Sequence, residues 1–356
     1  MVMSKDLIQQ TKVIDLFCGI GGLTHGLKNV GFDVVAGIDN DKTCEYGYEA
    51  SNGADFIAKD IADVHASELE KLYKGAKYKV LIGCAPCQPY SKLNRRSYTK
   101  EKQTPIEKFA ELVEQLKPDI VSMENVRGLA NKEKYPIFGK FLNTLEKNGY
   151  KYSYQVINTS DYGVPQSRNR LVLLASRHGD IALIEKTHKE HKVTVKDVIS
   201  NLQPLKDGEA SDSDPLHRAR KLSPLNKTRI SLTPKDGGDQ RSWPEELLLE
   251  CHKKPSGKSF TSVYGRMRWD QPSPTMTTQC TGIGNGRFGH PEQDRAITLR
   301  EAALFQTFPT DYKFYDPKKD VPMGQVAKFI GNAVPVRLGE VIGESIRNHL
   351  LQEVRS

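Results

Sequence analysis

Short apolar runs rich in β-branched residues alternate with longer amphipathic stretches through the first half of this chain of 356 residues. The runs at 12–17, 34–38, 79–83, 120–124, 153–158 and 170–175 are typical of strands. Helices fit between them, for example at 105–116 and at 135–148, where Gly149 follows the last helical position. This alternation predicts an α/β fold, with a doubly wound, mostly parallel sheet that carries helices on both faces.

The alternation of apolar runs and amphipathic stretches ends near His178. Polar runs at 207–214 and turn signals at 234–238 interrupt any long periodicity. Order returns near Thr298, with helices expected at 299–306 and 336–351. We therefore predict a larger domain from residues 1–190, completed by 321–356, and a smaller loop-rich domain from 191–320.

Charge and cysteine content limit the classes of protein to consider. Lysine and arginine number 52 against 44 acidic residues, a net charge of +8 that favours a polyanionic partner. Six cysteines are too few for a disulfide scaffold in a chain of this length, so a reducing compartment is expected. Residues 1–10 lack a signal-peptide pattern and no apolar run reaches membrane-spanning length, so we expect a cytoplasmic protein without membrane contact.

An apolar strand runs directly into a glycine-dense turn over residues 13–22, VIDLFCGIGG. Glycine allows a close approach of backbone to a ligand. Asp39 lies twenty residues after Gly19, at the end of the next strand, where a carboxylate can accept hydrogen bonds from both hydroxyls of a ribose. The glycine spacing departs from the dinucleotide fingerprint, so an adenosine-containing ligand without a pyrophosphate is favoured. The alternative is a tight turn beside a surface aspartate.

Two cysteines, Cys84 and Cys87, follow the strand expected at 79–83, at the end where open α/β sheets bind ligands. Zinc is disfavoured because no second Cys or His pair lies at ligand spacing. A redox pair is disfavoured because Pro89 follows too closely for the helix start that such pairs occupy. Two interpretations of Cys87 remain, a nucleophile and an inert buried cysteine.

The next strand ends at Glu124, so two strands would present a thiol and a carboxyl to one crevice. The alternative is an ordinary strand-end charge paired with Arg127. Further along, alternation over residues 166–170 sends Arg168 and Arg170 to one side of an extended run. Such guanidiniums hold a base edge or a phosphate, or else form structural salt bridges.

An irregular stretch between Gln88 and Pro105 carries five basic residues against one acid, Glu101. Loops of this length inside a domain are often functional. Positive charge beside a nucleophile fits a segment that closes over a phosphate backbone, although charge-rich surface loops are also common. The basic residues are Lys92, Arg95, Arg96, Lys100 and Lys102.

Together, these blocks resemble the DNA (cytosine-5) methyltransferases, especially bacterial enzymes of the restriction-modification type. The resemblance runs from Lys12 to about His349 in the motif order of that family, and only about residues 186–257 lack motif support. The matching blocks are DLFCGIGG at 15–22, Asp39, KDI at 59–61, PCQ at 86–88, ENV at 124–126, QSRNR at 166–170, TLRE at 298–301 and GNAVP at 331–335.

The resemblance implies an S-adenosylmethionine-dependent methyltransferase fold and methyl transfer to carbon 5 of cytosine in a specific duplex DNA sequence. It implies Cys87 as the nucleophile, Glu124 at ring nitrogen 3, and Arg168 and Arg170 near a flipped base. The residues implied around the cofactor are Phe17, Gly19, Ile20, Gly21, Gly22, Asp39, Asn40, Asp60, Ile61, Pro86, Asn332 and Val334.

The resemblance also makes 191–320 a target-recognition domain, in which Arg241, Arg266 and Arg268 are candidates to read guanines or hold phosphates. We also expect an enzyme of the bacterial cytosol that acts without a metal ion and as a monomer, since a duplex with a short target can be methylated one strand at a time. A cognate restriction endonuclease is expected as a genetic rather than a physical partner. Contacts to DNA are expected from Gln88, Ser91, Arg95, Arg96 and Thr275.

Two other functions remain open. A tRNA cytosine-5 methyltransferase would use the same Cys87 chemistry, although no mark of that branch is visible in the variable region. A catalytically silent DNA-binding regulator would keep the fold, but the intact PCQ and ENV blocks argue against it.

Overall fold

The computed structural model describes residues 7–86, 104–258 and 261–353. The chain divides into two units. The first consists of Met1–Thr159, Asn169–Lys186 and Val334–Ser356, and the second of Ser160–Arg168 and Thr187–Ala333.

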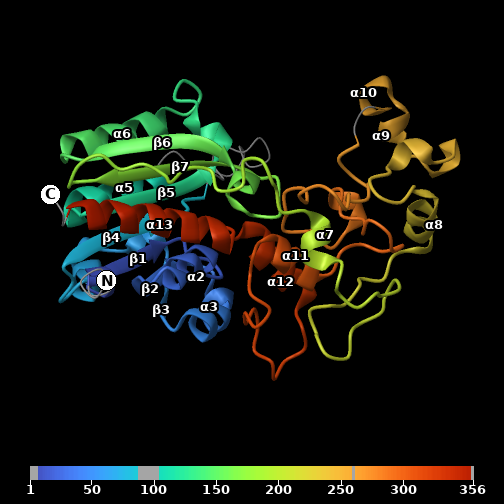
Figure 1. Ribbon diagram of the computed structural model, residues 1–356, viewed down its shortest axis with the longest axis horizontal. Coiled ribbons are helices and arrows are strands. Elements are labelled where there is room, and N and C mark those ends of the chain that lie inside the picture. The colour runs from blue at the N-terminus through green and yellow to red at the C-terminus, as the bar shows by residue number, and fades with distance from the viewer. Residues whose placement is uncertain (1–6, 87–103, 259–260, 354–356) are drawn as a thin grey trace. The chain divides into compact units, whose positions relative to one another are not determined.

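A seven-stranded sheet organises the first unit, in the order β3-β2-β1-β4-β5-β7-β6 (Figure 1). The strands are β1 (Thr11–Leu16), β2 (Asp33–Asp39), β3 (Asp55–Ala58), β4 (Tyr78–Gly83), β5 (Ile120–Val126), β6 (Lys151–Asn158) and β7 (Asn169–Ser176). Strands β1 to β5 pair in parallel, whereas β7 is antiparallel to both β5 and β6. The mostly parallel sheet confirms the predicted fold class. The prediction missed β3, whose four residues are too few to show a periodicity.

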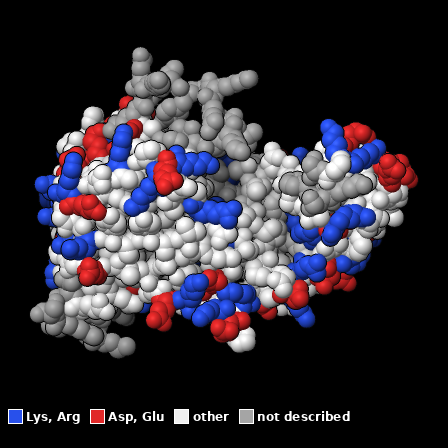
Figure 2. Space-filling model, turned by 90° about the horizontal axis from the view of Figure 1, so that it is seen from above, with Lys and Arg blue, Asp and Glu red and all other residues white. Residues whose placement is uncertain are grey.

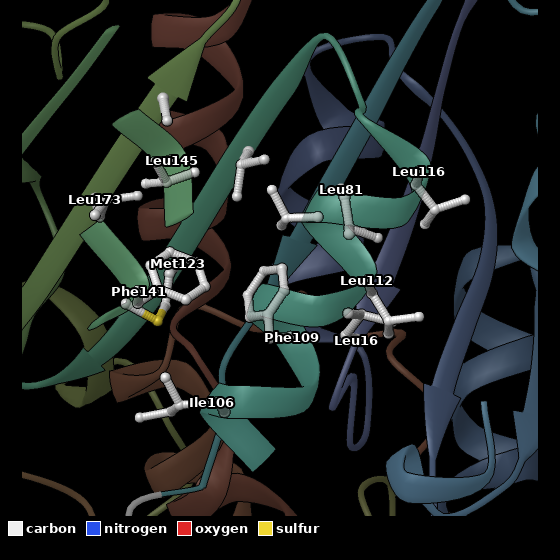
Figure 3. Packing of buried hydrophobic residues seen from close by; sticks show 14 of the residues in the cluster. Leu16, Leu81, Ile106, Phe109, Leu112, Leu116, Met123, Phe141, Leu145 and Leu173 are labelled. Atoms are coloured by element: carbon white, nitrogen blue, oxygen red, sulfur yellow. The ribbon is translucent and has the colours of Figure 1, made fainter. Parts of the chain in front are cut away.

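Helices cover both faces of this sheet. They are α2 (Gly22–Asn29), α3 (Glu45–Asn52), α4 (Ala66–Leu72), α5 (Pro105–Leu116), α6 (Pro136–Lys147) and α13 (Val336–Glu353). Adjacent strand residues point to opposite faces. Leu16 packs in the cluster that includes Phe109 of α5 and Phe141 of α6 (Figure 3), whereas Asp15 accepts a hydrogen bond from Thr24 of α2. The helices α2 and α5 therefore lie on opposite faces, as a doubly wound sheet requires.

The close packing of α2 against α13 joins the end of the chain to its beginning. A Cβ atom at Gly26 would lie 2.4 Å from the carbonyl oxygen of Val336, so the two helices meet where only glycine fits. The contact returns the last helix to the sheet domain, where the sequence analysis places residues 336–351.

The second unit has little regular structure. Its helices are α7 (Val195–Ile199), α8 (Pro224–Leu232), α9 (Glu250–Lys253), α10 (Pro255–Lys258), α11 (Leu299–Phe305) and α12 (Met323–Asn332). Among its described residues, β pairing is limited to isolated bridges such as Gln166 with Ser273.

This unit includes residues 160–168, 187–190 and 321–333, which were predicted to belong to the larger domain. The difference arises from long-range hydrogen bonds that sequence periodicity does not show. The side chain of Gln166 donates to Gln306 and accepts from the backbone N–H of Met276, and Gln306 donates to the carbonyl of Ala333.

On the face seen in Figure 2, basic and acidic side chains are interspersed over both units. None of the helices in the described ranges has the length and hydropathy needed to span a bilayer.

Candidate active site

The turn after β1 adopts a backbone that keeps space open. Phe17, Gly19 and Gly21 all have positive φ, at 60°, 50° and 91°. A Cβ atom at Gly21 would lie 2.7 Å from Cδ2 of Tyr48, whereas one at Gly19 would meet nothing within 4 Å. Gly21 is therefore required by conformation and packing, and Gly19 by conformation alone, with room beside it for a ligand.

Asp39 at the end of β2 is bound to this turn. Its Oδ2 accepts a hydrogen bond from the N–H of Gly19 at 2.9 Å, and its Oδ1 accepts one from the N–H of Asp41 at 2.9 Å. Burial raises the pKa of Asp39, and these backbone donors oppose the rise. Each carboxylate oxygen keeps a second lone pair, so Asp39 can still accept hydrogen bonds from a ribose. The structure thus brings together Gly19 and Asp39, as their spacing predicted.

The end of β3 lies at the same edge, because Ala58 pairs with Asp39. Asp60 follows and caps a short helix, η2 (Ile61–Asp63), by accepting a hydrogen bond from the N–H of Ala62 at 3.0 Å. Asn40 and Asp60 are both exposed, and Ile61 is half-buried. These three predicted cofactor residues therefore surround the same strand ends as Asp39.

Beneath the turn, Asp15 is fully buried. Its Oδ2 accepts a hydrogen bond from Oγ1 of Thr24 at 2.7 Å, while Oδ1 has no hydrogen-bond partner in the described part of the chain. Burial raises the pKa of Asp15 to about 7, the hydrogen bond from Thr24 opposes this rise, and the charge of Asp39 adds to it. A buried carboxyl whose ionisation is opposed by burial and by a second carboxylate favours a ligand with positive charge.

The second cluster lies where β4, β5 and β7 are neighbours. Glu124 is 2% exposed. Its Oε1 forms an ion pair with Nε of Arg170 at 2.9 Å, and its Oε2 accepts a hydrogen bond from the thiol of Cys84 at 2.8 Å. The alternative partner for Glu124, Arg127, is not the one observed. A buried carboxyl with a guanidinium on one oxygen can hold or release a proton on the other.

Asn125, the next residue of the ENV block, fixes the segment that leads to Cys87. Its buried side chain donates from Nδ2 to the carbonyl of Ala85 at 2.9 Å, and its Oδ1 accepts from the N–H of Val126 at 2.9 Å. These two hydrogen bonds give Asn125 a positioning role that was not predicted from the sequence. It sets the direction of the chain just before Pro86, which is exposed.

Arg168 is engaged elsewhere, in the second unit. It is 5% exposed, and its guanidinium donates to the carbonyls of Met276, at 3.0 Å, and Gly331, at 3.5 Å. The predicted pair of arginines is therefore divided between units, with Arg170 on Glu124 and Arg168 on backbone carbonyls. Alternation along the strand did not reveal this, because the chain passes from one unit to the other between residues 168 and 169.

The sequence matches the C-5 cytosine-specific DNA methylase family over residues 11–348. The chain belongs to this family. It is 50% identical over 339 residues to the Type II methylase M.HgiDII of Herpetosiphon aurantiacus, with 95% of each chain covered. It is 32% identical to the Type II methyltransferase M.PspPI of a Psychrobacter species, covering 94% of this chain and 78% of the relative.

Solved structures agree on the fold. A DNA modification methyltransferase encoded within an E. coli prophage superimposes with a TM-score of 0.72 at 23% identity, over 96% of this chain and 99% of that one. The methyltransferase EhMeth of Entamoeba histolytica gives 0.66 at 17% identity, over 96% and 99%. The chain is a DNA (cytosine-5) methyltransferase by family, and the use of S-adenosylmethionine follows from family and fold.

For this methyltransferase, Asp39 on a ribose, the open turn at Gly19 and the carboxyl of Asp15 fit an adenosine ligand that carries a cationic sulfonium. Gly22 begins α2, Ile20 is buried beside it, and Val334 is buried in the first unit. Asn332 is exposed at the end of α12 in the second unit.

Several predicted residues of the methyltransferase lie outside the described residues. They are Cys87, Gln88, Ser91, Arg95 and Arg96.

In the second unit, the residues predicted to contact DNA differ in exposure. Thr275 is half-buried and donates from Oγ1 to the carbonyl of Ser167 at 2.9 Å. Arg241 keeps an exposed side chain, although it pairs with Asp239 at 2.8 Å.

Arg266 is fully buried, and its guanidinium donates to four backbone carbonyls and to Asp294. The prediction that it reads a guanine or holds a phosphate is therefore wrong, because no donor of this guanidinium is available to DNA.

Proposed function

We propose that this chain methylates carbon 5 of one cytosine within a specific duplex DNA sequence, as the modification enzyme of a restriction-modification system. Cys87 forms a transient covalent bond to the target base. The observation that carries this proposal is the ion pair between the buried carboxyl of Glu124, near the end of β5, and Arg170 of β7, beside the strand that leads to Cys87.

The chemistry requires a nucleophile because carbon 5 of cytosine is too weakly nucleophilic to take a methyl group directly. The Cys87 thiolate adds to carbon 6 while Glu124 donates a proton to ring nitrogen 3, so the ring becomes electron-rich at carbon 5. S-adenosylmethionine supplies an electrophilic methyl group when bound. A base then removes the proton from carbon 5, the bond from sulfur to carbon 6 breaks, and the proton on nitrogen 3 returns to Glu124.

Arg170 holds Glu124 in place for both proton transfers, since its guanidinium stays charged throughout. The cofactor is held by the first unit, with Asp39 on the ribose hydroxyls and Phe17, Ile20, Asp60 and Ile61 around the adenosine. The target nucleotide leaves the stacked duplex to reach this site, at a cost of about a few kcal/mol.

The second unit is proposed as the target-recognition domain. A monomer is sufficient because each strand of a short site can be methylated in turn. The residues proposed to contact DNA are Gln88, Ser91, Arg95, Arg96 and Thr275. The nuclease that shares the recognition sequence is proposed as a genetic partner.

The decisive experiment compares the parent enzyme with Cys87→Ser on duplex DNA and on tRNA, using a labelled methyl donor. The parent is expected to label duplex DNA only, and Cys87→Ser to lose methyl transfer while it still binds the cofactor. Label in tRNA alone would establish the rival RNA activity, and no label in either would favour a silent regulator.

A second experiment traps the intermediate. Duplex DNA with 5-fluorocytosine at the target is expected to form a covalent adduct that survives denaturing gels, because fluorine does not leave carbon 5 as a proton does. Active enzyme without an adduct would contradict the covalent mechanism.

A further inference from the structure

Cys84, the second cysteine of the pair, belongs to the cluster around Glu124. Strands β4 and β5 are parallel, with Gly83 opposite Met123, so the residues that follow, Cys84 and Glu124, emerge side by side. The thiol of Cys84 is half-buried and donates to Oε2 of Glu124 at 2.8 Å. On the other side, β7 is antiparallel to β5 and brings Arg170 to Oε1.

The two partners of Glu124 differ in kind. Arg170 is a permanent cation whose Nε lies 2.9 Å from Oε1 in an ion pair, and this positive charge disfavours a proton on that oxygen. A thiol is a weak donor and a weak acceptor, and its hydrogen can rotate away from the oxygen. The proton that Glu124 exchanges with the target cytosine is therefore carried by Oε2, the oxygen that Cys84 contacts.

We propose that Cys84 is a positioning residue for methyl transfer. Its thiol donates a hydrogen bond to Oε2 of Glu124, and the S–H rotates away when Oε2 carries the proton that is exchanged with ring nitrogen 3. The inference rests on the role proposed for Glu124. When Oε2 is ionised the thiol donates to it, and when Oε2 is protonated the S–H turns away, so the proton on Oε2 can point at ring nitrogen 3 while the sulfur stays beside the oxygen. The carboxyl thus keeps one orientation in both states. It is therefore already aligned with the target cytosine when the proton is transferred.

Alanine and serine at position 84 separate this role from mere packing. In Cys84→Ala the carboxyl loses its second partner, so the single-turnover rate of methyl transfer should fall about tenfold, with KM for DNA and for cofactor unchanged within about twofold. Serine also donates and accepts. Its shorter side-chain bond places the hydroxyl about 0.4 Å farther from Oε2, still within hydrogen-bond range. Cys84→Ser should therefore keep a rate within about threefold of the parent.

Two controls accompany this pair. Cys251→Ala removes an exposed cysteine of the second unit and should leave the rate and both KM values unchanged. Thermal unfolding checks that each variant is folded. If Cys84→Ala is not folded at the assay temperature, Cys84→Val replaces it, because valine fills the volume of the thiol without donating a hydrogen bond, and the same tenfold loss is expected.

A double-mutant comparison distinguishes this inference from the proposed function. Because Cys84 acts through Glu124, adding Cys84→Ala to Glu124→Gln should cause no further loss of rate. Full activity of Glu124→Gln would overturn the proposed role of Glu124, and the inference with it. A large loss in Glu124→Gln with undiminished rates in both Cys84→Ala and Cys84→Val would overturn the inference alone. Equal losses in the alanine and serine variants would also overturn it.

Discussion

Replacement of Asp15 by asparagine should change how the stability of the first unit depends on pH. Asp15 is buried beneath the cofactor turn, and its pKa of about 7 in the folded chain compares with an ordinary value of 3.8. Asparagine keeps an oxygen that can accept the hydrogen bond from Thr24, but it does not titrate. The substitution therefore isolates the cost of placing an ionisable group at this position.

The sign follows from the raised pKa. Below about pH 4, both the folded and the unfolded chain hold the proton of Asp15, so its contribution is fully present. As the pH rises to about 7, the unfolded chain releases the proton while the folded chain keeps it, and stability is lost. One pH unit corresponds to about 1.4 kcal/mol, so the loss between 3.8 and about 7 approaches about 4 kcal/mol.

Equilibrium urea unfolding at constant ionic strength, from about pH 5 to about pH 8, measures the part of this difference above pH 5, which is about 2–3 kcal/mol. The free energy of unfolding of Asp15→Asn, minus that of the parent, should increase as pH rises. This difference should level off above about pH 7. Any fixed cost of the new amide shifts the curve without changing its slope. Asp33→Asn, which removes an exposed carboxylate from the start of β2, is the matched control and should follow the parent. Parallel curves for Asp15→Asn and the parent would refute the reasoning.

Two further predictions concern the second unit. Gly331→Ala should lower its melting temperature, at a cost of about 1–3 kcal/mol, because a Cβ atom there would lie 2.2 Å from the backbone carbon of Thr277. Gly324→Ala in the same helix meets nothing within 4 Å and should stabilise by about 0.5–1 kcal/mol; equal effects of both would contradict the packing argument. Burial alone would raise the pKa of Glu301, but its hydrogen bonds and charge pairing with Arg295 outweigh burial and lower it. Thermal unfolding should therefore show stability lost as pH falls below about 4.5, and this loss should disappear in Glu301→Gln.

Local patterns predicted much of the first unit because its elements depend on nearby residues. The helix at 105–116 was predicted with its observed bounds. Its amphipathic run begins at Pro105 and is capped by Thr104 and Glu107, whose side chains hydrogen-bond to each other's backbone N–H. The link between Gly19 and Asp39 was also predictable, since consecutive parallel strands place their carboxyl ends together.

The cluster around Glu124 required the tertiary structure. From the sequence, Cys84 received no role in the proposed site, and alternation placed Arg168 and Arg170 on one side of the chain. The parallel pairing of β4 with β5 placed Cys84 on Glu124, and the antiparallel β7 added Arg170 alone. Strand order and register depend on contacts between residues far apart in the chain, which a single sequence does not display.

By itself, therefore, the sequence determined the doubly wound fold, the family and the types of group that the chemistry needs, because strand periodicity and motif spacing are local properties. Only the tertiary structure decided which of those groups meet. It gave Glu124 two unlike partners, directed Arg168 to backbone carbonyls of the second unit and buried Arg266 away from solvent. The physical reason is that a buried polar group must find its partners wherever the fold brings them, whatever their separation in sequence.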